Sequence, residues 1–101
     1  MQSRYAKGRS REYAAMSLLK RDGWLVSRSA ASHGAVDVFA AKGGRMLLIQ
    51  VKSGKARVKK EELEALVDWG RQSRADAEVW HFRGRGTMER RRVYAAEAAS
   101  R

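Results

Sequence analysis

Two consecutive glycines, Gly43 and Gly44, separate two runs of strand-forming residues and restrict the folds that this chain can adopt. The runs cover residues 35–41 and 46–52, and both are rich in branched or aromatic side chains, which favour β-strands. Glycine accepts positive φ angles freely, and a two-residue hairpin turn requires them. The pattern therefore predicts an antiparallel hairpin, around which the rest of the chain must be arranged.

The remaining segments alternate between helical and strand-like patterns. Some carry apolar residues at helical spacing, and others are short runs of branched or aromatic residues. The expected helices are 10–21, capped by Ser10, and 61–72, and the expected strands beyond the hairpin are 24–27, 78–82 and 90–94. This order, αβββαββ, predicts an α/β domain in which helices flank a mixed five-stranded sheet. Residues 95–101 are expected to form a short helix or to fray.

Length and charge indicate one small domain with a polyanionic partner. The chain has 101 residues, 44% apolar, so we expect a single domain over 1–101 with its core in about 5–94. Lys and Arg number 22 against 11 Asp and Glu, a formal charge of +11. Nucleic acid is the favoured partner, because cations that neutralise phosphates release condensed counterions, and an anionic membrane surface is the second possibility.

Other compositional features exclude several classes of protein. There is no cysteine, which excludes disulfides and thiolate zinc sites and makes packing or oligomerisation the source of stability. The N-terminal residues lack an apolar targeting segment, and the longest strongly apolar run, 46–49, is too short to cross a bilayer. We therefore expect no membrane association and a cytoplasmic protein that stays with the DNA, in the host cytoplasm if the chain is viral.

The predicted hairpin brings an acid, an amide and an ammonium group together. A two-residue turn places Asp37 opposite Gln50, with Cβ atoms roughly 5 Å apart. Strand side chains alternate between faces, so Gln50 and Lys52 share one face. The apolar residues of the second run point to the other face: Leu47, Ile49 and Val51. Such a group suits a hydrated hard cation such as Mg²⁺. A half-buried hairpin with an ordinary solvent-exposed polar face gives the same alternation, and spacing alone leaves that alternative open.

Several ordered motifs resemble those of the archaeal-type Holliday junction resolvases, within the PD-(D/E)xK nuclease superfamily. Asp37 followed by Gln50-Val51-Lys52 is similar to the D…(D/E)xK motif of the superfamily. The segment YAKGRSRE, residues 5–12, resembles the Y-x-K-G-x-x-x-E opening of those resolvases. The segment GWLVSRSA, residues 23–30, is similar to their G-aromatic-x-V-x-R-S-A strand and loop. The resemblance covers roughly residues 5 to 82.

The resemblance implies a restriction-endonuclease-like core and a structure-selective endonuclease that resolves four-way DNA junctions as a homodimer. In such enzymes Asp37, the residue at position 50 and the Val51 carbonyl would bind Mg²⁺, with Mn²⁺ as a substitute. Glu12 would reach the metal from the first helix, although taken alone it is an ordinary first-turn acid favoured by the helix dipole. Lys52 would orient the attacking water or stabilise the phosphorane. The loop residues Arg28 and Ser29 would contact the scissile phosphate.

Gln50 departs from the family, which has an acid at this position. A unit charge about 4 Å away is worth several kcal/mol at an effective dielectric near 20, so its loss weakens a metal site. Three explanations remain: a natural amide that is tolerated as a ligand, an engineered substitution, or a binding protein that has lost catalysis. We prefer the first, with Glu12 supplying the missing charge. The alternative functions are another repair or restriction-like nuclease of the superfamily, and a non-catalytic junction-binding module.

Basic residues bracket the proposed site and predict the DNA-binding surface. They are Lys7, Arg9, Arg11, Arg28, Lys55, Arg57, Lys59 and Lys60. The acids of 61–68 are expected to lie apart from this surface: Glu61, Glu62, Glu64 and Asp68. Two symmetric cuts in a four-way junction favour a two-fold dimer, and we place Trp69 at its interface and Trp80 in the core. The isolated histidines, His33 and His81, are assigned no role.

Overall fold

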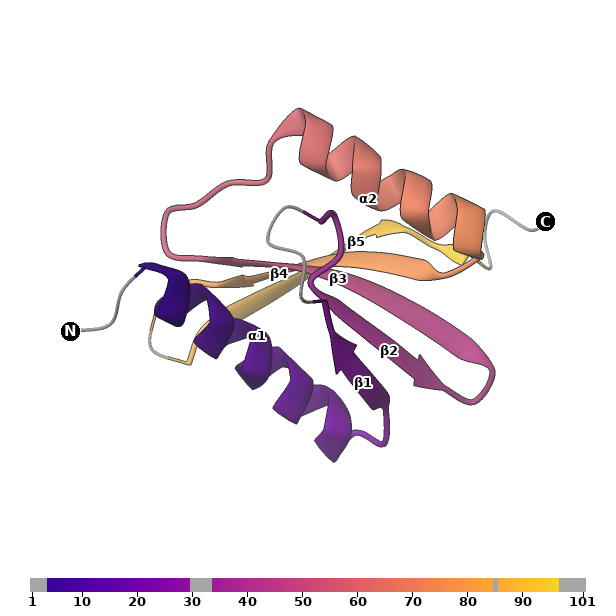
Figure 1. Cartoon of the computed structure of the whole chain (residues 1–101), viewed down its shortest axis with the longest axis horizontal. Helices are drawn as coiled ribbons and strands as arrows, with labels where there is room; N and C mark the ends of the chain where they lie inside the picture. The colour runs from indigo at the N-terminus through magenta and orange to yellow at the C-terminus, as the bar shows by residue number, and fades with distance from the viewer. Residues whose placement is uncertain (1–3, 30–33, 85, 97–101) are drawn as a thin grey trace.

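The sheet of this protein has five strands in chain order, β1-β2-β3-β4-β5 (Figure 1). Only β3 and β4 are parallel among the neighbouring pairs that the structure describes. The computed structural model describes residues 4–29, 34–84 and 86–96, and side chains from residue 9 onward. The elements are α1 (Arg4–Arg21), β1 (Leu25–Arg28), β2 (Val38–Lys42), β3 (Arg45–Ser53), α2 (Lys60–Ser73), β4 (Asp76–Phe82) and β5 (Met88–Tyr94). The expected order αβββαββ and the mixed sheet are confirmed.

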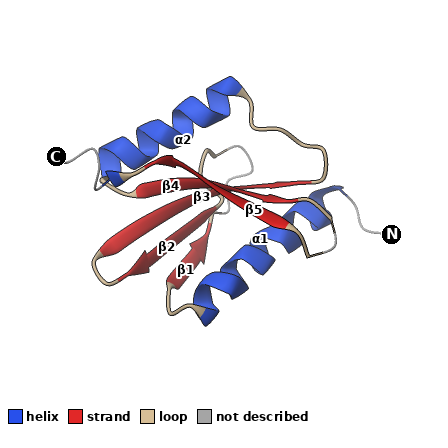
Figure 2. Cartoon of the chain, turned by 180° about the vertical axis from the view of Figure 1, so that it is seen from behind, coloured by secondary structure: helices blue, strands red, loops and turns tan. Residues whose placement is uncertain are grey.

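The two helices cover opposite faces of the sheet, as Figures 1 and 2 show. On the face covered by α1, the "α1 face", Leu47, Ile49 and Trp80 are at most 1% exposed and pack against α1. On the opposite face, the "α2 face", Leu48 and Leu66 belong to a second buried cluster. Trp80 therefore lies in the core, as expected. Both faces of β3 are buried, so the alternative of an exposed polar face is wrong. Among the helices described, none is long and apolar enough to cross a membrane.

The glycine turn sets the register of the hairpin. Gly43 and Gly44 have φ angles of 56° and 79°, the positive values that a tight turn between twisted strands requires. Lys42 pairs with Arg45, and the register continues to Val38 opposite Ile49. The two-residue turn predicted from the sequence is therefore confirmed.

Several element boundaries differ from expectation. Helix α1 begins at Arg4 rather than at residue 10, because the residues before Ser10 are mostly good helix formers and continue the helix. Ser10 is consequently an interior residue and not the cap. Strand β2 begins at Val38 instead of residue 35. The remaining strands shift by one or two residues at their ends. Residues 97–101, expected to form a short helix or to fray, lie outside the described residues.

Candidate active site

Asp37 lies immediately before β2, and its backbone and side chain both bind neighbouring segments. Its amide donates a hydrogen bond to the Ile49 carbonyl at 2.8 Å, and its carbonyl accepts one from the Ser29 amide at 2.8 Å. Its Oδ2 atom accepts a hydrogen bond from the Val51 amide at 2.7 Å. A side chain that bonds the backbone competes with the regular strand ladder. Here the side chain takes the Val51 amide of β3, and this bond fixes the carboxylate against β3.

The surroundings of Asp37 disfavour its charged form. Burial raises the pKa of the carboxyl from 3.8 to about 6, against the hydrogen bond from Val51, which lowers it. The charges of Glu12 and Glu62 raise the pKa further, whereas the charge of Lys52 lowers it. Two additional carboxylates and one ammonium group therefore act on Asp37. One of the acids belongs to α1 and the other to α2.

Gln50 is buried with an unsatisfied oxygen. The residue is 6% exposed, and its Oε1 is the one buried side-chain N or O atom without a hydrogen-bond partner in the part of the chain that the structure describes. A buried acceptor left unpaired costs about 1–3 kcal/mol. Gln50 directly precedes Val51, whose amide binds Asp37, so the unpaired oxygen belongs to the same stretch of β3 as the Asp37 contact. An unpaired oxygen here is suited to a cation or a water molecule.

Lys52 lies on the α2 face with Gln50, two residues away along β3. Its Nζ donates to Glu62 Oε2 at 2.7 Å, and the two side chains are 16% and 31% exposed. Glu62 Oε1 also accepts a hydrogen bond from the Lys59 amide at 2.9 Å. Burial alone would raise the pKa of Glu62, but the bonds from Lys52 and Lys59 bring it below its ordinary value. Glu62 thus holds the ammonium group of Lys52 in one position.

The sequence interpretation of Glu62 was wrong. Glu62 is expected to lie apart from the basic surface with the other acids of 61–68, whereas it contacts Lys52. Periodicity along a helix gives no information about which strand residue the first turn of that helix meets, so the pattern contains no signal for this contact. Glu61, Glu64 and Asp68 are exposed or pair elsewhere, as Asp68 does with Arg71.

Glu12 and Arg28 form a pair beside the site. Arg28 Nη1 donates to Glu12 Oε1 at 3.2 Å, and this hydrogen bond raises the pKa of Arg28. The guanidinium also lies 5.2 Å from the centre of the Tyr13 ring, a cation–π contact. Glu12 is not a first-turn acid, because α1 begins two turns earlier. The alternative explanation of Glu12 by the helix dipole is therefore wrong.

The predicted metal ligands have mixed chemistry. Across the described parts of the chain, no group of three or more His, Asp or Glu side chains is placed to hold a metal ion. The expected set contains only two carboxylates, completed by the Gln50 amide and the Val51 carbonyl. The N–H and C=O groups of one strand residue point to the same side. Since the Val51 amide points at Asp37, its carbonyl faces the same side.

Apart from Arg28, which pairs with Glu12, the expected DNA-binding residues divide into three groups. Arg9 and Arg11 are on α1, where Arg11 lies 5.7 Å from the centre of the Phe82 ring, and the Lys7 side chain lies outside the described residues. Lys55 and Arg57 line a pocket after β3. Lys59 and Lys60 are exposed at the start of α2.

Trp69, expected at a dimer interface, is 52% exposed, and His33 lies outside the described residues.

Comparisons with known proteins agree on one family. The model of the archaeal Holliday junction resolvase (Hjc) family matches residues 3–94. The chain is 36% identical over 72 residues to the crossover junction endodeoxyribonuclease Hjc of Methanocaldococcus jannaschii, an alignment covering 68% of this chain and 53% of that protein. The chain thus spans about half the length of this relative. The structure of Archaeoglobus fulgidus Hjc, a Holliday junction resolvase, superposes with a TM-score of 0.76 at 28% identity, covering 86% of this chain and 73% of the other.

Proposed function

The chain belongs to the archaeal Holliday junction resolvase family, and on that premise we propose that it is a structure-selective DNA endonuclease that resolves four-way junctions by metal-dependent phosphodiester hydrolysis. We propose that the protein is cytoplasmic and stays with the DNA that it cuts. The observation that carries this proposal is that the Asp37 carboxylate is bound to the Val51 amide of β3, and that the preceding residue, Gln50, has an unpaired buried oxygen. Magnesium is the cofactor we propose, with manganese as its substitute.

The residues present fit a hard divalent cation. Asp37, Gln50 Oε1 and the Val51 carbonyl offer oxygen atoms, which are the donors that Mg²⁺ prefers. The raised pKa of Asp37 and the unpaired Gln50 oxygen are both costs that a bound cation would relieve. When bound, such an ion neutralises charge on the phosphate and lowers the pKa of water. Glu12, whose charge already acts on Asp37, supplies additional negative charge in place of the family acid.

The chain's own side chains position and stabilise the reacting phosphate. The Lys52 ammonium group, oriented by Glu62, stabilises charge that develops on the phosphate oxygens and donates a proton. Arg28 presents a guanidinium beside Ser29, whose amide is bonded to the Asp37 carbonyl. We propose that Arg28 and the Ser29 hydroxyl contact the scissile phosphate.

The test is cleavage of a labelled four-way junction and a matched linear duplex, in Mg²⁺ and in EDTA. We expect the wild type to cut the junction only with metal, and Asp37→Asn and Lys52→Ala to bind the junction without cutting it. A chain that binds in both buffers, never cuts, and gains no activity from Gln50→Glu would refute the catalytic proposal.

A non-catalytic junction-binding module is the second candidate, and Gln50 is the observation that favours it. An amide in place of an acid removes one charge from the site, whereas the net charge of +11 that attracts DNA remains. In that case Asp37→Asn would leave both junction affinity and its independence of Mg²⁺ unchanged. Another superfamily nuclease would instead cut linear duplex as fast as the junction.

We further propose that the active form is a homodimer, because two strands must be cut in a symmetric junction and one protomer offers one site. Trp69 supports this assignment, since a large aromatic side chain exposed to 52% on α2 is a suitable interface anchor. Sedimentation of the wild type and of Trp69→Ala tests it: a wild type that is monomeric at the concentrations at which it cuts would exclude the dimer.

A further inference from the structure

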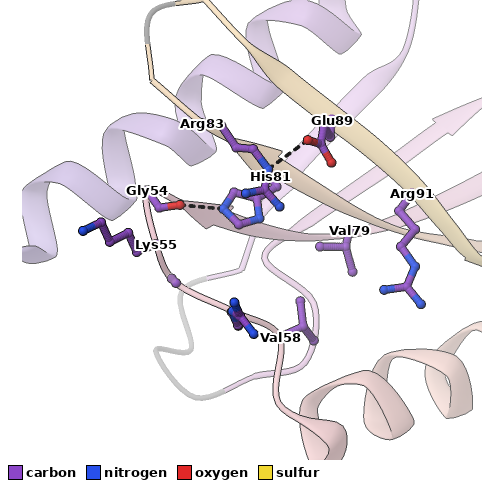
Figure 3. A pocket seen from close by; sticks show the side chains of 10 residues that line it. Gly54, Lys55, Val58, Val79, His81, Arg83, Glu89 and Arg91 are labelled. Atoms are coloured by element: carbon purple, nitrogen blue, oxygen red, sulfur yellow. Dashed lines mark hydrogen bonds and ion pairs between the residues drawn. The ribbon is translucent and has the colours of Figure 1, made fainter.

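A basic pocket lies between the loop after β3 and the strands β4 and β5, with a volume of about 590 Å³ (Figure 3). Its polar side chains come from the loop, from both strands and from the start of the turn between them: Lys55, Arg57, His81, Arg83, Glu89 and Arg91. Val58 and Val79 add apolar surface. A volume of this size is typical of sites for small ligands or ligand fragments. The expected DNA contacts included Lys55 and Arg57 but none of the residues from β4 and β5.

The charge of this basic pocket is unbalanced. Four cations face a single carboxylate, Glu89, which pairs with Arg83 at 2.9 Å. No described acid forms an ion pair with Lys55, Arg57 or Arg91. The His81 ring is fixed by a 2.8 Å hydrogen bond with the Gly54 carbonyl, drawn in Figure 3. The pocket therefore presents several cationic donors to an anionic ligand.

The basic pocket adjoins the candidate active site across β4. Strand register places Gln50 beside Val79 and Val79 beside Arg91. In the next row, Lys52 lies beside His81. Since paired residues on neighbouring strands share a face, these side chains all lie on the α2 face. Strands are about 4.8 Å apart, so Arg91 arises about 10 Å from Gln50.

We propose that the basic pocket binds a second phosphodiester of the DNA, on the strand that is cut and at a fixed distance from the scissile phosphate. This inference rests on the proposed function, because it extends the path of the same substrate across β4 and β5. An arginine guanidinium donates two parallel hydrogen bonds to phosphate oxygens, and its positive charge strengthens them. Val58 and Val79 give the adjoining sugar an apolar surface. Contacts of this kind fix the register of the DNA without reading its sequence.

The binding test compares two variants that each lose two positive charges. Arg57→Ala/Arg91→Ala removes two cations of the basic pocket, and Lys20→Ala/Arg21→Ala removes two exposed cations from the last turn of α1. In EDTA, at fixed salt, we expect the pocket variant to bind a four-way junction at least tenfold more weakly. The slope of log K against log salt concentration should become less steep by about 1 to 2 units. The control should change affinity less than threefold, and equal losses in the two variants would overturn the proposal.

Phosphate mapping gives the decisive readout. Single phosphates of the junction are replaced in turn by neutral methylphosphonates, and binding to each is measured. Replacement at one position beside the cut should weaken binding by the wild type. The same replacement should not change binding by the pocket variant. If no position behaves in this way, the pocket does not bind backbone phosphate. If inorganic phosphate binds the wild type at micromolar concentration while junction affinity is the same in both proteins, the pocket serves a free anion instead.

These outcomes are separable from failure of the proposed function. A wild type that cuts junctions, with a pocket variant that binds and maps like the wild type, refutes only the pocket. A wild type that has no preference for branched over linear DNA refutes junction resolution, whatever the pocket does. Circular dichroism of both double variants verifies that neither has lost the fold.

Discussion

Replacing Asp37 by Asn should stabilise the fold at alkaline pH, although the variant should lose the proposed cleavage activity. The pKa of Asp37 is raised to about 6 from 3.8, mainly by burial, so the folded state binds this proton more tightly than the unfolded state. The contribution of this proton to the free energy of unfolding is fully present below pH 4, and it is lost as the pH rises through 6. A shift of this size corresponds to about 3 kcal/mol at most, and partial exposure reduces it to about 2 kcal/mol.

Asn retains the acceptor for the Val51 amide but has no charge to bury. The variant should therefore be more stable than the wild type by about 2 kcal/mol at pH 8, or roughly 10 °C in Tm for a domain of this size. Below pH 4 the two proteins should unfold together, because protonated Asp and Asn are alike. Added Mg²⁺ should reduce the difference in stability between the two proteins at pH 8, because it should stabilise only the wild type.

The assay is chemical and thermal unfolding between pH 3.5 and 8.5 in EDTA, repeated with Mg²⁺ at pH 8. Asp68→Asn is the control, because Asp68 is exposed and pairs only across one turn of α2. That variant should change stability by a few tenths of a kcal/mol. If Asp37→Asn is less stable at pH 8, or if its difference in stability from the wild type does not vary with pH, folding does not raise the pKa of Asp37.

Three further substitutions test the site and its support. Gln50→Glu should tighten Mg²⁺ binding at least tenfold by calorimetry at pH 8, because it adds a charge to the ligands; unchanged affinity would separate Gln50 from the metal. Glu62→Gln should lower kcat for junction cleavage about tenfold with little change in KM, since it loosens Lys52, and a faster enzyme would show that Glu62 restrains Lys52. Gly70→Ala should destabilise the fold by about 1–3 kcal/mol in denaturant unfolding despite alanine's helix propensity, because its Cβ would lie 2.8 Å from Tyr94 Cδ1; a more stable variant would contradict this.

Local patterns in the sequence were sufficient for the order of the elements and the hairpin register. Gly43 and Gly44 determine the turn, and the turn alone determines which residues of β2 and β3 are paired. The position of Asp37 beside β3 followed from the same reasoning. These features depend on residues close together in the chain, whose preferences are readable without knowledge of the fold.

Contacts between distant segments were not predictable in the same way. The pairing of Lys52 with Glu62 depends on how the loop after β3 returns the first turn of α2 to the sheet. The basic pocket combines a loop with two strands that follow α2. The early start of α1 was missed because Ser10 is a good cap residue that here lies inside a helix. Each depends on tertiary packing, which overrides local preference.

The acids that flank Asp37 come from helices docked on opposite sides of the sheet. A partly folded chain that keeps the hairpin but loses either helix would still carry most of its cations, and so would still attach to DNA. On the proposed function, it would lack Glu12 or the Lys52–Glu62 pair and would therefore bind DNA without cutting it. Completion of the fold would then act as a safeguard against indiscriminate damage to the chromosome by newly made or damaged molecules.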